Sequence, residues 1–542
     1  MPGEAPEKAV RSARYVSRAR LARRRVALTA ASLLAAAVAG HLWIERFLVP
    51  RYRAVAARAL TERIPGASLG DRASLDWRGR LVLGPLEVPA RERRAPPLLR
   101  AETVRVRPRW LALLRGRAEP ACVTLGGVRI EAGPEGREIR AFLDRPARAG
   151  RGGGAPATPP SPPEVRIEDA TIALDAPGGP PLLLGPLSAR FASAGQAIEA
   201  DASLDDVPIA FHGLLRWDAR RRRLALEGAW LSLGRGERVR VDLWGEAVLG
   251  PEPRLSAAAR LGPIDYAALL ESLPEELVPE QGPRPSGPFA ARLAVAGPLG
   301  RPSEWAISGD LDLSALRRAA RAGPPSSLLS SFVWRPGEDD HSRGILIGPE
   351  SGTFVPLAEL PAYVIRAVTT SEDAGFFAHH GFDFDEIRNA LAEGAEAHRL
   401  RGASTITQQV AKNLFLTRER TLARKVKEAL LTVALEASLP KARILEIYLN
   451  IAEFGPGLHG IGQAARQWFG KEARALSPRE AAFLATVLPS PSRVGALLAG
   501  GEMPEAWRER VDGLLLKMRA AGQLDDDQLR EALGKPLAFA RG

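Results

Sequence analysis

The spacing of apolar residues changes once along this chain, and that change limits its fold more than any other feature. Between about residues 52 and 320, short runs alternate apolar and polar side chains, as in residues 103–107 (TVRVR) and 238–243 (RVRVDL). Such alternation places one set of side chains on one face of a sheet. After about residue 330, apolar residues recur at helical spacing, among them Leu422, Val426, Ala429, Leu430 and Val433. The pattern predicts an antiparallel β-rich region over 52–320 and a mostly α-helical domain over 331–535.

A segment of low complexity interrupts the β-rich region. Residues 146–163 consist only of Pro, Gly, Ala, Arg, Ser and Thr, and such a composition favours a flexible linker or a long loop. It divides the β-rich region into 52–145 and 164–320. At 542 residues, the chain is long enough for two or three folded units.

The N-terminus combines a basic tail with an apolar run. Residues 1–25 contain eight Lys or Arg and two Glu. Their net charge of +6 is half of the chain's net charge of +12. The apolar run that follows predicts a transmembrane helix over 26–47, long enough for the hydrocarbon layer. The basic flank predicts a cytoplasmic N-terminus and a single-pass protein of the inner membrane with its remaining domains in the periplasm. A cleaved signal peptide and a buried helix are the alternatives; the run is longer than a usual signal core and no clear cleavage site follows it.

Two further classes of function are not expected. Because the basic tail adjoins a membrane segment, it does not indicate a nucleic-acid partner. The one cysteine, Cys122, excludes an intrachain disulfide and a cysteine-based zinc site.

Two polar clusters contain more chemically active side chains than a hydrophobic core requires. In residues 371–381 (SEDAGFFAHHG), the adjacent carboxylates Glu372 and Asp373 precede Phe376 and His379. Residues 402–413 (GASTITQQVAKN) carry hydroxyl, amide and ammonium groups on Ser404, Thr405, Gln409, Lys412 and Asn413. A carboxylate beside such a face suits removal of a proton from a hydroxyl near a phosphate-bearing leaving group.

In order along the chain, these clusters and three later motifs resemble the peptidoglycan glycosyltransferase domain of family 51, and within it the monofunctional biosynthetic branch. The resemblance covers about residues 355–495. Its motifs are residues 372–381, 402–413, 424–428 (RKVKE), 444–471 and 480–491.

The resemblance implies a lysozyme-like α-helical lobe and a smaller membrane-facing lobe. It implies an enzyme that polymerises lipid II onto a lipid-linked glycan strand by inverting transfer, with release of undecaprenyl pyrophosphate. The sequence contains no Ser-x-x-Lys motif after these motifs and no Lys-Thr-Gly motif at any position. Transpeptidase activity is therefore not expected, and a transpeptidase or another cell-wall synthase is the expected partner.

The first motif contains the expected catalytic base. We expect Glu372 to take the proton of the acceptor 4-hydroxyl, and Asp373 to orient His379 or a backbone turn. Asp373, Phe376 and His379 are assigned to the substrate-binding side of the site. Alone, an adjacent Glu-Asp pair is more often a helix N-terminal cap, so the accompanying motifs carry this assignment.

The second and third motifs contain the expected phosphate-binding groups. If a helix begins at Ser404, then Thr405, Gln409 and Lys412 share one face. Arg424 is expected to bind phosphate in a bidentate manner, with Lys425 and Asn413 as further substrate-binding residues. Glu428, also assigned to catalysis, would hold Arg424 or Lys412 in place or ligate a divalent cation (Mg²⁺ or Mn²⁺); no tightly bound cofactor is expected. The ordinary alternative for Arg424 and Glu428 is a surface ion pair of about 0.3–0.5 kcal/mol.

The β-rich region resembles proteins of the AsmA type, whose twisted sheets hold lipid in an apolar groove. The resemblance rests on residues 110–116 (WLALLRG) and 123–131 (VTLGGVRIE). A periplasmic β-sandwich that spaces the catalytic domain from the membrane is the other interpretation.

Two other functions compete with the enzyme. One is a catalytically weak envelope scaffold or lipid-binding protein that acts through its β-rich region. The other is a lysozyme-like hydrolase, which needs an acid and has no use for a cationic phosphate site.

Overall fold

The computed structural model describes residues 29–540 apart from several internal stretches. These stretches are 64–65, 77, 90–96, 98, 110–119, 133–163, 175–181, 192–196, 205–206, 219–220, 235–238, 249–251, 300, 338–343, 398–403, 418–420 and 495–502. The predicted basic tail, the predicted linker and the 110–116 motif lie outside the described residues. The chain forms two compact units, Met1–Leu174 with Leu183–Gln196, and Asp175–Leu182 with Ala197–Gly542.

Among the described residues, one helix, Thr29–Arg58, is long and apolar enough to cross a membrane. Its side chains Leu33 and Leu34 expose 71% and 67% of their surface, as expected of a helix that needs lipid around it. After a π-helical turn at Ile44–Leu48, its last part forms the start of α2 (Val49–Arg63). Val49 and Tyr52 of α2 are buried against the strands of the first unit, so α2 connects the apolar helix to that unit.

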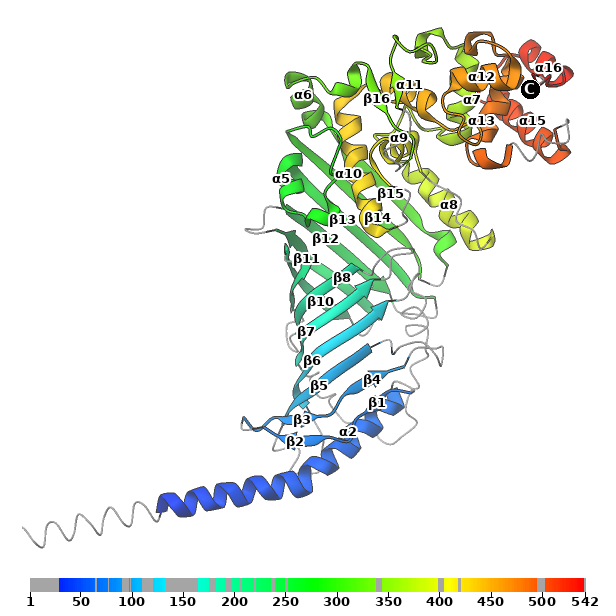
Figure 1. Ribbon diagram of the computed structural model, residues 1–542. Coiled ribbons are helices and arrows are strands. Elements are labelled where there is room, and N and C mark those ends of the chain that lie inside the picture. The colour runs from blue at the N-terminus through cyan, green and yellow to red at the C-terminus, as the bar shows by residue number, and fades with distance from the viewer. Residues whose placement is uncertain are drawn as a thin grey trace, which may run out of the picture. The chain divides into compact units, whose positions relative to one another are not determined.

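The first unit contains short N-terminal strands followed by longer ones, drawn in blue to cyan in Figure 1. They are β1 (Ser68–Leu69), β2 (Ala73–Leu75), β3 (Leu81–Leu83), β4 (Leu86–Val88), β5 (Leu99–Pro108), β6 (Pro120–Ala132), β7 (Glu164–Leu174) and β8 (Leu182–Phe191). The pairs among β1–β6 are antiparallel, whereas β6 and β7 run parallel, with Cys122 opposite Glu164. This parallel pair departs from the predicted antiparallel pattern. Two parallel neighbouring strands need a long connection, because the chain must return to the end of the sheet where the first strand began. Here the connection between β6 and β7 is residues 133–163.

The second unit begins with a fully antiparallel sheet in which each strand pairs with the next. Its strands are β9 (Ala197–Leu204), β10 (Val207–Asp218), β11 (Arg223–Leu233), β12 (Val239–Val248), β13 (Arg254–Asp265), β14 (Pro288–Pro298) and β15 (Ala306–Asp312). Two short helices, α5 (Tyr266–Glu271) and α6 (Ser314–Ala322), follow β13 and β15, and β16 (Phe332–Trp334) pairs with β17 (Ile345–Ile347).

The rest of the second unit is helical, as the apolar spacing predicts. The helices are α7 (Ala362–Glu372), α8 (Phe384–Ala397), α9 (Ile406–Phe415), α10 (Leu422–Ser438), α11 (Lys441–Ile451), α12 (Ile461–Phe469), α13 (Pro478–Val487), α15 (Glu505–Ala520) and α16 (Asp526–Gly534). Seven of the eleven residues of α11 are buried, which makes it the central helix of the main core. Ser477 caps α13 in a capping box with Glu480, three residues farther along the chain.

Helix α10 lies against the β-sheet of the same unit (Figure 1). Its residues Leu430 and Val433 pack in one buried cluster with Leu316 of α6 and with Ile264 and Phe289 of β13 and β14. A β-bulge between Leu261 and Ile264 turns both side chains toward this cluster. The sheet and the helical part of the second unit therefore share a hydrophobic core.

Candidate active site

The first predicted motif forms the loop that leaves α7. The helix ends at Glu372 because Asp373 adopts an extended backbone (φ −166°). The Asp373 side chain is buried, and its Oδ2 accepts a hydrogen bond from the backbone N–H of Ile406 at 2.9 Å. That N–H belongs to the first turn of α9, where a carboxylate is favoured by the unpaired N–H groups and the helix dipole. Asp373 thus joins the loop to the helix that carries the second motif.

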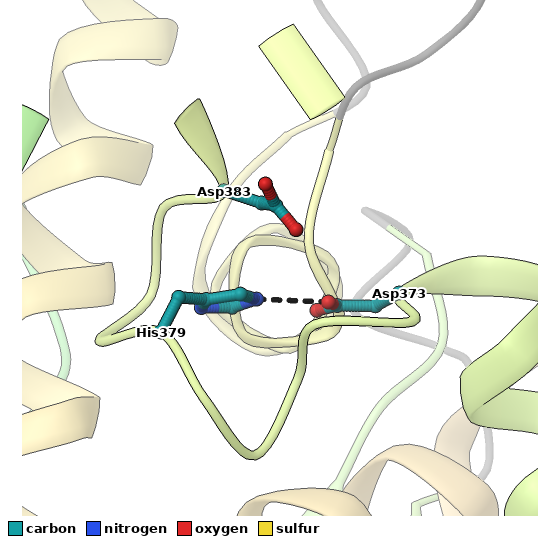
Figure 2. Close-up of side chains that lie close together, drawn as sticks. All are labelled: Asp373, His379 and Asp383. Atoms are coloured by element: carbon teal, nitrogen blue, oxygen red, sulfur yellow. Dashed lines mark hydrogen bonds and ion pairs between the residues drawn. The ribbon is translucent and has the colours of Figure 1, made fainter. Parts of the chain in front are cut away.

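His379 completes this junction. Its Nδ1 accepts a hydrogen bond from the N–H of Gly381 at 3.1 Å, so in the neutral ring the proton resides on Nε2 and is donated to Asp373 Oδ1 at 2.8 Å. Figure 2 shows the two side chains facing each other. Both groups hold the loop in shape, as predicted for Asp373, and the ring has no lone pair left to take a proton from a substrate.

Asp383 lies beside this pair and was not singled out from the sequence. The ligand atoms of Asp373, His379 and Asp383 all lie within 4.8 Å of one another (Figure 2). As bonded, however, the histidine offers no lone pair, and Asp383 also accepts from the N–H of Glu386 as the cap of α8. This arrangement fits a structural junction and does not fit a resident metal ion.

Glu372 differs from its neighbour because its carboxylate is only partly buried. The side-chain amide of Gln409 donates to Glu372 Oε2 at 2.9 Å, and the hydroxyl of buried Tyr448 donates to Gln409 Oε1 at 3.3 Å. The Tyr448 hydroxyl also lies within hydrogen-bond reach of Glu372, so it faces both the amide and the carboxylate. Burial raises the pKa of Glu372, opposed by the Gln409 hydrogen bond and the charge of Lys412. An oriented carboxylate with a raised pKa suits a general base.

Basic side chains gather where α9 faces the start of α10. Arg424 Nη1 donates to Glu428 Oε2 at 2.7 Å, and Lys425 contacts the other oxygen of the same carboxylate. The pKa of Lys412 is lowered mainly by partial desolvation and also by the charges of Arg424 and Lys425, while Glu428 and Glu372 oppose the shift. Lys412 therefore lies within electrostatic reach of the other two cations and of both carboxylates. The excess positive charge suits an anionic leaving group.

Glu428 takes the first of its two predicted roles. It is 3% exposed and holds Arg424 in place together with Lys425. Because both of its oxygens already contact cations, a divalent cation does not fit there.

Three other predicted residues occupy different places from those expected. Helix α9 begins at Ile406, two residues after Ser404, and Thr405 is its N-cap in a capping box with Gln408. The Thr405 hydroxyl donates to the carbonyl of Gly381 at 2.7 Å and is buried, so it stabilises the loop and presents no hydroxyl face. Phe376 is fully buried, and its ring packs inside the loop where it cannot contact a substrate.

Asn413 lies on α9, and Ser404 lies just before it. Both are partly buried, and the carbonyl of Asn413 accepts from Trp334 Nε1 at 3.0 Å. Sequence reasoning missed Tyr448 because it lies within an apolar helical stripe, where a tyrosine is ordinarily a core residue. The one available signal is its place in the fourth motif.

The fold and the site define a transglycosylase domain: the family described as "Transglycosylase" matches residues 343–519. The chain is 49% identical over 225 residues to the biosynthetic peptidoglycan transglycosylase of Xanthomonas campestris pv. campestris, which covers 41% of this chain and 89% of that protein. It is 53% identical over 143 residues to the protein of that name from Shewanella denitrificans, over 26% of this chain and 62% of that protein. A third relative of that name, from Bdellovibrio bacteriovorus, is 46% identical over 140 residues, or 26% of this chain and 56% of that protein.

The chain belongs to the biosynthetic peptidoglycan transglycosylase family. It spans about three fifths of the length of the Shewanella and Bdellovibrio relatives and most of the Xanthomonas one. Among solved structures, penicillin-binding protein 1A from Haemophilus influenzae is similar at 20% identity and a TM-score of 0.21, over 39% of this chain and 22% of that chain. A score this low supports no argument about the fold.

Proposed function

We propose that this protein polymerises lipid II into glycan strands by inverting glycosyl transfer and releases undecaprenyl pyrophosphate. The observation that carries the proposal is one oriented carboxylate, Glu372, that interacts with the charge of Lys412, which in turn interacts with Arg424 and Lys425. A hydrolase would need the carboxylate and would have no use for the cations, so this pairing favours transfer from a diphosphate donor.

The reaction assigned to this site is a single displacement. Glu372 accepts the proton of the acceptor 4-hydroxyl while that oxygen bonds to C1 of the donor sugar. The bond from C1 to the diphosphate breaks at the same time, and its electron pair leaves on the diphosphate. Lys412 and Arg424 stabilise this growing negative charge. Because attack and departure occur on opposite faces of C1, the configuration inverts and a β-1,4 bond results.

The test is polymerisation of lipid II by the full chain in detergent. Glu372→Gln should lower the rate constant by roughly 10²- to 10⁴-fold, the usual contribution of a general base, and leave the circular dichroism spectrum unchanged. Glu359→Gln is the matched control, because Glu359 is an exposed glutamate shortly before α7. Full activity of Glu372→Gln would remove Glu372 as the base, and an inactive wild type would remove the function.

We further propose that the apolar helix is a retained anchor, with the basic tail in the cytoplasm and the transglycosylase domain in the periplasm. Support for retention comes from the unbroken helix Thr29–Arg58, whose Val49 and Tyr52 belong to the core of the first unit. Alkaline phosphatase fused to the C-terminus of the chain should be active, because the proposed topology places that end in the periplasm. Loss of an N-terminal tag from the mature protein would show cleavage instead. A transpeptidase is the partner proposed for crosslinking, to be sought by co-purification.

A second proposed role concerns the β-rich region and accompanies the enzyme activity. An open hollow of about 410 Å³ lies on the sheet of the second unit, and its lining is almost entirely apolar. The strand register places lining residues such as Ala257 and Leu293 on the same face as Leu261 and Phe289, which α10 covers farther along the strands. This uncovered apolar face supports an AsmA-like role, with a lipid chain as the ligand.

Lipid extraction from the purified full chain, followed by mass spectrometry, tests this role. Leu293→Asp places a charge in the hollow and should remove co-purifying lipid. Ala294→Asp, on the opposite face of the same strand, should retain it. Absence of lipid from the wild type would favour the spacer interpretation.

A further inference from the structure

Helix α6 lies outside the matched transglycosylase segment, yet one of its side chains reaches the catalytic loop. We propose that Arg317 is a positioning residue for catalysis, an inference that rests on the proposed function. It acts through Glu436 and His380 to hold the loop from Glu372 to Gly381 against α9. The β-rich region would then supply a part of the active-site support that the matched segment, 343–519, does not contain.

Glu436 is the centre of this arrangement. It lies on α10, its side chain is 1% exposed, and cations approach it from two other helices. Arg317 Nη2 lies 3.3 Å from Glu436 Oε2, and Arg317 Nε donates to the Glu436 carbonyl at 3.0 Å. On the other side, Lys441 Nζ of α11 lies 2.7 Å from Oε1. A buried carboxylate is stable only with such partners, so Glu436 fixes the mutual positions of α6, α10 and α11.

The same carboxylate connects to α9, the helix of Gln409 and Lys412. The Thr407 hydroxyl donates to Glu436 Oε1 at 2.6 Å, and both groups are buried. Because Gln409 lies two residues farther along α9, a shift of Glu436 would move the amide that holds the proposed base.

The catalytic loop rests directly on this cluster. Arg317 Nη2 donates to His380 Nδ1 at 3.2 Å, and Lys441 Nζ lies 4.2 Å from the centre of the Phe376 ring. Gly381 has φ +94°, and a Cβ added there would lie 3.1 Å from Glu436 Cγ. The loop therefore packs too closely on Glu436 to keep its position if that side chain moves.

Helix α6 is itself held firmly enough to act as a support. Leu316, next to Arg317, is fully buried in the cluster that contains Leu430 and Val433 of α10. In addition, the Tyr266 hydroxyl of α5 donates to the Leu430 carbonyl at 3.0 Å. Arg317 is thus presented by a packed element, and its side chain is 28% exposed.

The test compares Arg317→Gln and Arg317→Lys with Arg321→Gln, an exposed arginine on the same helix. Hydrogen exchange of residues 372–381, thermal unfolding, and kcat and KM for lipid II are measured on the full chain well below its Tm. Arg317→Gln should speed exchange in the loop and lower kcat by roughly 10- to 100-fold, since small misplacements of catalytic groups have effects of this size. KM should change less than about twofold. Arg317→Lys should recover part of kcat, because an ammonium can pair with Glu436 but cannot make all of the guanidinium contacts.

A purely structural joint would lower Tm and leave kcat and loop exchange at their wild-type values, and this result would overturn the proposal. Equal losses in Arg321→Gln would overturn it as well. The exchange measurement does not depend on lipid II. If the wild type fails to polymerise lipid II, the proposed function fails, while the effect of Arg317 on the loop is still decided.

Discussion

Tyr448 offers the sharpest test of how the proposed base is oriented. Its hydroxyl donates to Gln409 Oε1, whose amide N–H₂ faces Glu372, and it also lies within hydrogen-bond reach of Glu372 itself. In Tyr448→Phe, the partly buried amide oxygen and the Glu372 carboxylate both lose the hydroxyl, and the amide can rotate so that its oxygen faces the carboxylate. One hydrogen bond contributes about 0.5–1.5 kcal/mol net. If this free energy is lost in the transition state, kcat falls roughly 2- to 13-fold.

The chain contains a matched control on the helix of Glu372 itself. The Tyr363 hydroxyl donates to the carbonyl of Leu476 at 2.6 Å, far from the amide of Gln409 in the hydrogen-bond network. Tyr363→Phe therefore removes a comparable hydrogen bond with no link to the base. Both variants should lower the Tm by about 1–6 °C, as expected for a domain of about 200 residues.

The assay is the rate of lipid II polymerisation at saturating substrate, together with thermal unfolding of each variant. Only Tyr448→Phe should lose kcat, while both lose similar stability. The reasoning is refuted if Tyr448→Phe keeps the wild-type kcat, or if Tyr363→Phe loses as much.

Three further predictions follow from the charges and caps of the site. Activity should fall as pH decreases through the raised pKa of Glu372, because the base must be deprotonated; Lys412→Gln should move this acid limb to higher pH, and a shift to lower pH in a pH–rate profile would contradict the assignment. Glu428→Gln leaves the partly buried Arg424 with a weaker partner and should lower stability by about 1–3 kcal/mol, measured by denaturant unfolding against Glu359→Gln; an unchanged midpoint would refute it. Thr405→Val removes the cap of α9 and should lower stability by about 0.5–2 kcal/mol, whereas Thr405→Ser should restore most of it; equal values for the two would contradict the capping role.

Features that depend on near neighbours in the chain are readable from the sequence. The capping box of Ser477 and Glu480 spans three residues, and the helical spacing after residue 330 needs only a few turns to be recognised. The start of α9 shows the limit of such reasoning. Thr405 was assigned to a ligand-binding face, but its hydroxyl bonds to Gly381, 24 residues away. That partner becomes visible only once the loop has folded onto the helix.

The motifs therefore specify which side chains take part, and the apolar periods specify the kind of element that carries each one. They leave open which partners those side chains meet. Gln409 and Tyr448 are 39 residues apart, and Arg317 and Glu436 are 119 apart. The parallel pairing of β6 and β7 likewise joins segments on either side of a long connection. Contacts of this kind arise from the packing of whole elements, which no local pattern encodes. They hold the partly buried carboxylate of Glu372 in one orientation.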